Sequence, residues 1–146
     1  MRERLRIKSY IRHLNWLVIL VIAGNKFLLR PWVREHFDPS VGLIIVNSLP
    51  NFVEAVIGTV ALSGIGLVLR ARFPQFLSNL KENTVYVTAT LLASIYVLTQ
   101  EFNLHSLGGN NTYDPYDVVA SVTGLIFIYV ILNTYGMLTN QHALEE

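Results

Sequence analysis

The sequence contains no cysteine and little charge. Of its 146 residues, 14% are Asp, Glu, Lys or Arg, whereas a soluble domain usually carries about 25%. The lack of cysteine excludes disulfides, thiolate metal sites and cysteine nucleophiles. The scarcity of charge excludes a disordered chain and a nucleic-acid-binding protein, and it argues against an ordinary water-soluble enzyme. The sequence also has no phosphate-binding glycine loop and no serine-hydrolase motif.

Long apolar runs take the place of the missing charge, because 52% of the residues are hydrophobic. A helix needs about 20 mostly apolar residues to cross a hydrocarbon core of ~30 Å. We therefore predict an all-α polytopic membrane protein with four transmembrane helices and short loops. The four apolar segments are residues 13–29, 41–69, 83–100 and 118–138. Residues 1–142 are expected to form one domain, and residues 143–146 a tail without a function.

Pro50 interrupts the second apolar segment. Proline is tolerated in the first turn of a helix and is disruptive further inside it. We therefore expect the spanning helix to begin near Pro50 and to end near Arg70, with a half-buried apolar stretch before it. The alternative is one longer helix that is kinked at Pro50.

The basic residues indicate how the chain is oriented in the membrane. Five of them precede the first span and three lie between the second and third, against three on the opposite side. Lysine and arginine collect on the cytoplasmic side of a bacterial inner membrane. The distribution therefore predicts that both termini are cytoplasmic and that residues 101–117 face outward.

Polar residues gather at the predicted outer ends of the spans. Asn51 and Glu54 share one helical face, and so do Asp114, Asp117 and Ser121, because their spacings are three and four. We expect these residues to line an outward-facing acidic cavity with cations from the first span. The candidate ligand-binding residues are Lys26, Arg30, Asn51, Glu54, Gln100, Glu101, Asp114, Asp117 and Ser121.

Several of these residues also have a purely structural interpretation. Asp114 precedes a proline and could cap a helix. The carboxylate of Asp117 would then lie in the first turn, where it interacts favourably with the positive end of the helix dipole. Glu54 lies inside a span, where it must pair with a cation, be protonated or face water. Gly58 and Gly124 are expected to serve close helix packing.

No cofactor is expected, although one metal site is conceivable. Carboxylates and imidazole suit divalent cations, and the possible ligands are Glu54, Glu101, His105, Asp114 and Asp117. No established metal-binding spacing is present.

One stretch of the sequence resembles a known family. Glu101 near the end of one segment is followed by Asp114, Asp117 and Gly124 in the run TYDPYDVVASVTG, and this order resembles the VanZ-like family of bacterial membrane proteins. Asn111 stands where that pattern often has arginine, and Ser121 where it often has asparagine. The resemblance implies a multi-pass envelope protein linked to teicoplanin-type glycopeptide resistance.

Three functions remain open at this point. The first is binding of an envelope precursor or a glycopeptide-related ligand in the outward cavity, with membrane lipid as a further partner. The second is a membrane-embedded hydrolase or transferase that acts on a lipid or its head group, with Glu54 as its acid or base. The third is a small transporter or an assembly partner. The oligomeric state is left open.

Overall fold

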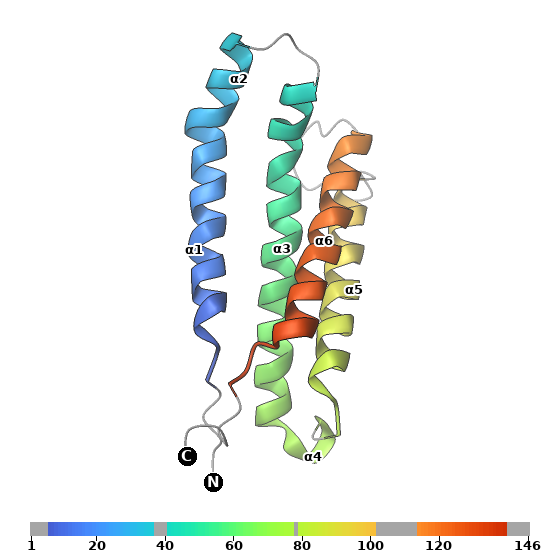
Figure 1. Cartoon of the computed structure of the whole chain (residues 1–146). Helices are drawn as coiled ribbons and strands as arrows, with labels where there is room; N and C mark the ends of the chain where they lie inside the picture. Colours follow the sequence, from blue (N-terminus) through green and yellow to red (C-terminus); the bar gives the residue numbers. More distant parts are fainter. Residues whose placement is uncertain (1–5, 37–40, 78, 102–113, 140–146) are drawn as a thin grey trace.

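The chain forms long helices that lie side by side (Figure 1). The computed structural model describes residues 6–36, 41–77, 79–101 and 114–139. The all-helical fold class is confirmed for these residues. In chain order the elements are α1 (Ser9–Gly24), the π-helical segment η1 (Asn25–Leu29), α2 (Arg30–His36), α3 (Val41–Arg72), α4 (Pro74–Leu77), α5 (Glu82–Glu101) and α6 (Pro115–Tyr135).

Three helical rods are long and apolar enough to cross a membrane. They are Ser9–His36, which joins α1, η1 and α2 over 28 residues, Val41–Arg72 with 32 residues, and Pro115–Tyr135 with 21 residues. The fourth rod, α5, has 20 residues, which is long enough, but its threonines and other polar residues make it less apolar. The structure therefore supports three of the four predicted spans.

The surface of the first rod has the composition expected of a lipid-facing helix. Large apolar side chains are exposed along its length, among them Leu20 (66%), Phe27 (70%) and Leu28 (70%). Water-soluble monomers seldom expose apolar patches of this extent. The exposed apolar side chains and the hydropathy of the helices thus both indicate a membrane protein.

The helix α3 runs unbroken from Val41 to Arg72 with Pro50 inside it. The prediction that the spanning helix begins at Pro50 is therefore wrong, and the alternative of one longer helix describes its extent. The helix is not interrupted at Pro50. A residue of a neighbouring helical segment explains why the helix continues.

Asn25 supplies the hydrogen bond that Pro50 cannot donate. Proline has no N–H, so the carbonyl four residues earlier, that of Val46, loses its helical partner. The side-chain Nδ2 of Asn25 donates to this carbonyl oxygen at 2.9 Å, and Asn25 is only 2% exposed. Membrane helices tolerate proline where a neighbouring side chain satisfies the freed backbone group. Asn25 is the first residue of η1, and it allows α3 to continue.

The helices α3 and α6 run in the same direction (Figure 1), and their backbones approach closely at Gly124. A Cβ atom at Gly124 would lie 2.5 Å from the carbonyl oxygen of Phe52 and 3.1 Å from Cβ of Ala55. Glycine is therefore the residue that permits this approach. Gly58 differs from the expectation, because no neighbouring atom lies within 4 Å of a Cβ built there. Close packing does not account for Gly58.

The two ends of the described chain are joined beside the start of α1. Ile7 forms an isolated antiparallel bridge with Leu138, and the hydroxyl of Tyr10 donates to the carbonyl oxygen of Gly136 at 2.7 Å. Gly136 has φ +62°, a conformation that glycine adopts without strain. These contacts tie the beginning of α1 to the end of α6.

A tyrosine on α5 completes this junction and provides a test of it. The buried N–H of Met137 donates to the hydroxyl of Tyr86 at 2.7 Å, and this hydroxyl donates to Glu82 at 3.2 Å. We expect Tyr86→Phe to lower the free energy of unfolding by about 1–3 kcal/mol, because the Met137 N–H would stay buried without a partner. Denaturant unfolding in detergent micelles would measure the change.

The matched control is Tyr96→Phe in the same helix. Within the described residues, the Tyr96 hydroxyl accepts from the side chain of Gln100 at 2.6 Å. Tyr96 is 54% exposed, so solvent or head groups can replace this partner. We expect a change below about 0.5 kcal/mol there, as for most exposed positions. An equal loss in both variants would contradict the structural role of Tyr86.

Candidate functional site

The first turn of α6 carries two of the predicted carboxylates, and they have different roles. Asp114 is the N-cap, and its side chain accepts from the N–H of Tyr116 at 2.9 Å, with Pro115 at the first helical position. This arrangement satisfies a backbone donor that the helix itself leaves free. The structural interpretation of Asp114 therefore holds, and the carboxylate fixes where α6 begins.

Asp117 lies within the first turn and is half-buried. Its Oδ1 atom is buried without a hydrogen-bond partner within the described part of the chain. The same is true of the hydroxyl oxygens of Ser121, which is 0% exposed, and of Ser48 on α3, which is 5% exposed. We call Ser48, Asp117 and Ser121 the polar floor. Buried polar atoms nearly always have partners, so these three oxygen atoms retain the capacity to accept a hydrogen bond. Asn25, Arg30 and Ser63 also carry a buried polar atom without a partner within the described residues.

The register of α3 and α6 brings the three residues to neighbouring levels. Gly124 lies beside Phe52, and Ser121 and Ser48 lie three and four residues before them. At 1.5 Å per residue, the two serines are within ~2 Å of the same level. Asp117 lies about one turn further toward the start of both helices. The floor thus follows the upper part of the α3–α6 interface (Figure 1).

Glu54 does not belong to this floor. It is exposed, and it shares a face of α3 with the exposed residues Ile57 and Ile65. Glu54 follows Phe52 by two residues and Asp117 precedes Gly124 by seven, so they are separated by ~13 Å along the helix axes. The prediction that Glu54 and Asp117 lie at one level of the membrane is therefore wrong. The register separates them because α3 begins earlier than was predicted.

The predicted cations of the first rod also lie apart from the floor. Lys26 is exposed and its Nζ lies 5.7 Å from the ring centre of Phe27. Arg30 donates through Nη2 to the backbone carbonyl of Asn47 at 3.4 Å. Arg30 thus contacts α3 from the first rod, whereas α6 packs on α3 through the Gly124 contact. No hydrogen bond or ion pair within the described residues joins Lys26 or Arg30 to the acidic residues of α6.

The remaining predicted residues contribute less to a site. Asn51 is half-buried on α3, and Gln100 donates to the hydroxyl of Tyr96 at 2.6 Å. Glu101 is the last residue of α5, and its side chain lies outside the described residues, as does His105. Within residues 6–36, 41–77, 79–101 and 114–139, no group of three metal-ligating side chains is present.

Two buried polar residues, Asn25 and Ser48, are absent from the predicted site residues. Asn25 was not expected to contact α3, although Pro50 signals that the carbonyl of Val46 needs a donor from elsewhere. Ser48 was assigned to the start of a helix at Pro50, whereas it lies inside α3. The internal proline signals that a donor is needed, but only the tertiary structure shows that Asn25 supplies it.

The comparisons with known proteins add no identity. No family model matches the chain, and no similarity is found to a curated protein or to a solved structure. The function proposed for this protein is therefore based on its own residues and their geometry.

Proposed function

We propose that this protein is a bacterial inner-membrane protein that binds an envelope-related ligand at the outer ends of α3 and α6. The observation that carries the proposal is the polar floor, with three buried oxygen atoms that lack a partner. One carboxylate and two hydroxyls suit a ligand that offers hydroxyl or amide donors. The sugar or peptide portion of an envelope precursor has this chemistry, and so does a glycopeptide-related molecule.

Two of the three residues of the polar floor lie in the part of the sequence that resembles the VanZ-like family. Asp117 and Ser121 belong to the run that carries the resemblance, and Gly124 completes it. The resemblance is the reason for proposing a link to teicoplanin-type resistance. The orphaned oxygen atoms are an independent reason for proposing a ligand.

The proposed topology has four spans, with α5 as the additional one. The 20 residues of α5 reach ~30 Å, and α5 lies alongside α3 and α6 (Figure 1). Its buried face packs Ala93 and Val97 against Ala55 and Leu125, so its polar residues need not all meet lipid. Both termini are proposed to be cytoplasmic, because most of the basic residues lie at that end.

The isosteric variant Asp117→Asn tests the proposed function. It keeps the shape of the side chain and removes the charge, and we expect it to weaken ligand binding about tenfold, the cost of one charge-assisted hydrogen bond. The measurement is the teicoplanin tolerance of a susceptible Gram-positive host that expresses the wild-type or the variant protein. We expect tolerance from the wild type and its loss in the variant.

The matched control is Glu35→Gln, which removes a carboxylate from an exposed position at the end of the first rod. It should leave tolerance unchanged. Equal tolerance of the Asp117→Asn and wild-type strains at equal membrane abundance would overturn the proposal, and so would a wild-type protein that confers none.

The two other functions have less support from the geometry. The hydrolase or transferase hypothesis needs Glu54 in a desolvated pocket to act as acid or base, and this residue is exposed. A transporter needs polar groups that continue toward the middle of the membrane. Two buried polar residues lie there on α3. Thr59 donates to the carbonyl of Ala55 in its own helix at 2.9 Å, and Ser63 is buried among apolar neighbours of α3. We therefore favour binding over both alternatives.

A further inference from the structure

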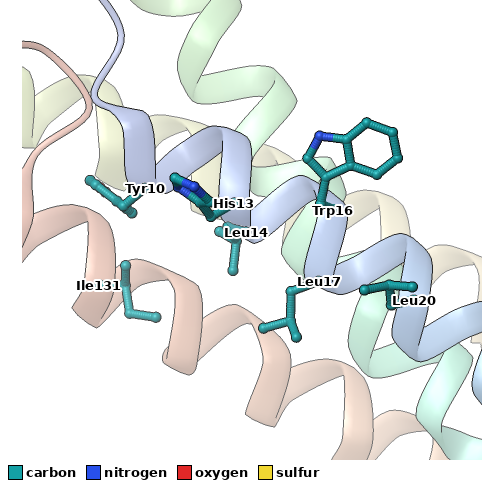
Figure 2. Close-up of a pocket in the computed structure, with 7 residues that line it drawn as sticks. All are labelled: Tyr10, His13, Leu14, Trp16, Leu17, Leu20 and Ile131. Carbon is teal, nitrogen blue, oxygen red and sulfur yellow. The ribbon is translucent and has the colours of Figure 1, made fainter.

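An apolar groove separates α1 from α6, at a distance from the polar floor. It has a volume of 470 Å³, and all but one of its lining residues come from α1. Figure 2 shows Leu14 and Leu17 extending from α1 toward α6, and Ile131 extending from α6 toward α1. The lining residues are Tyr10, His13, Leu14, Trp16, Leu17, Leu20 and Ile131. The side chains that line the groove are thus apolar or aromatic except at one end.

The dimensions of the groove match one half of a bilayer. The lining positions on α1 extend from Tyr10 to Leu20, which is ~15 Å of helix. The hydrocarbon core of a bilayer is ~30 Å thick, so this length is that of one leaflet. Trp16 (63%), Leu17 (57%) and Leu20 (66%) remain largely exposed, so an acyl chain can reach them from the side.

The polar end of the groove is basic. His13 and Tyr10 line it, and Arg12 is exposed one turn before Trp16, on the same helical face. Arg6 is exposed beyond it, while the Nζ of Lys8 already donates to the carbonyl of Tyr135. Basic residues at the cytoplasmic ends of grooves between membrane helices bind anionic lipid head groups.

We propose that the α1–α6 groove binds the acyl chain of an anionic phospholipid whose phosphate lies at Arg12 and His13. The imidazole Nδ1 of His13 is engaged with the carbonyl of Ser9 at 2.8 Å, so Nε2 is the nitrogen left for the phosphate, to which it donates when the ring is the imidazolium cation. A second copy of the chain is a poorer occupant. Copies in one membrane are oriented alike, so a second copy would bring its own Arg6 and Arg12 against the same residues here.

The two tryptophans of the chain provide the test. Trp16 lines the groove, whereas Trp32 lies in α2, at the other end of the same rod. The Trp32→Phe variant reports on the groove alone, and the Trp16→Phe variant is its matched control. Each is placed in vesicles that contain a small fraction of brominated phosphatidylglycerol or brominated phosphatidylcholine, and fluorescence quenching is measured.

We expect Trp16 to select brominated phosphatidylglycerol over brominated phosphatidylcholine about fivefold, the effect of one basic residue near an anionic surface. Trp32 should show no selection. Adding Arg12→Gln and His13→Gln should bring the selectivity of Trp16 close to one, and adding Ile131→Phe, which fills the groove, should reduce quenching by both lipids. Ile126→Phe, at an exposed position outside the groove, should not.

Three results would overturn the proposal. The first is equal quenching of Trp16 by the two lipids. The second is selectivity that persists in the Arg12→Gln and His13→Gln variant. The third is protection of Trp16 from both lipids while Trp32 is quenched, which would assign the groove to a second copy. Loss of the proposed envelope function leaves these outcomes unaffected, because the polar floor and the groove share no residue.

Discussion

Replacing Asn25 by leucine is expected to lower the free energy of unfolding by about 1–3 kcal/mol, which is the cost of leaving a buried carbonyl without its hydrogen bond. Leucine has a similar size, so the variant removes the donor to Val46 without leaving a large cavity. The cost depends on Pro50, because proline is the reason that this carbonyl is free. Unfolding in detergent micelles or bicelles would measure the loss.

A double-mutant cycle isolates this dependence. In the Pro50→Ala background, residue 50 regains an N–H four residues after Val46, and the helix satisfies its own carbonyl. Asn25→Leu should then cost about 1–2 kcal/mol less than it does in the wild type, a coupling within the range of residues that share a partner. Additive effects of the two substitutions would contradict the proposed replacement of the proline hydrogen bond.

Gly124→Ala is expected to have the other large effect, a loss of about 1–3 kcal/mol in stability. A Cβ atom at this position would meet the carbonyl oxygen of Phe52 at 2.5 Å and the Cβ of Ala55 at 3.1 Å. Both obstacles belong to the backbone of α3 or lie next to it, so no side-chain rotation relieves the contact. The helices α3 and α6 would have to separate, and the thermal midpoint in micelles would report the change.

Two glycines of α3 give a graded control for this prediction. A Cβ at Gly66 would lie 2.6 Å from Cγ1 of Val85, a stiff side chain that must move, but it would meet no backbone atom of another helix at such a distance. Gly58→Ala meets no neighbour and should be neutral or stabilising, since alanine favours helices over glycine by about 1 kcal/mol. The expected order of stability is therefore Gly58→Ala, then Gly66→Ala, then Gly124→Ala. A Gly124→Ala variant as stable as Gly58→Ala would show that the helices do not meet here.

The helices themselves could be predicted from the sequence, because hydropathy and helix length depend on local composition. Three predicted spans coincide with rods of 28, 32 and 21 residues, although the predicted span 118–138 extends three residues past the end of its rod at Tyr135. The N-cap at Asp114 follows from its position before Pro115. The helix start at Pro50 could not be predicted correctly. Whether proline ends a helix depends on a donor from another helix, and Asn25 lies 25 residues earlier in the sequence.

The candidate site shows the same division between local and tertiary information. Spacing correctly placed Asp117 and Ser121 on one helical face, since that relation lies within a single helix. Spacing could not tell which face of α3 meets α6, so Glu54 was grouped with residues that lie ~13 Å away along the axes. Ser48, which the structure brings level with Ser121, was not considered for the site.

The sequence by itself determined that the chain is helical, that it is suited to a membrane and which residues are polar at the helix ends. These properties follow from composition, since apolar runs favour lipid and leave only helices to satisfy the backbone there. The tertiary structure decided which of the few polar groups meet. Gly124 sets the register of α6 against α3, and Asn25 replaces the donor that Pro50 lacks. Both depend on the contact between two helices, which no periodicity within one helix specifies.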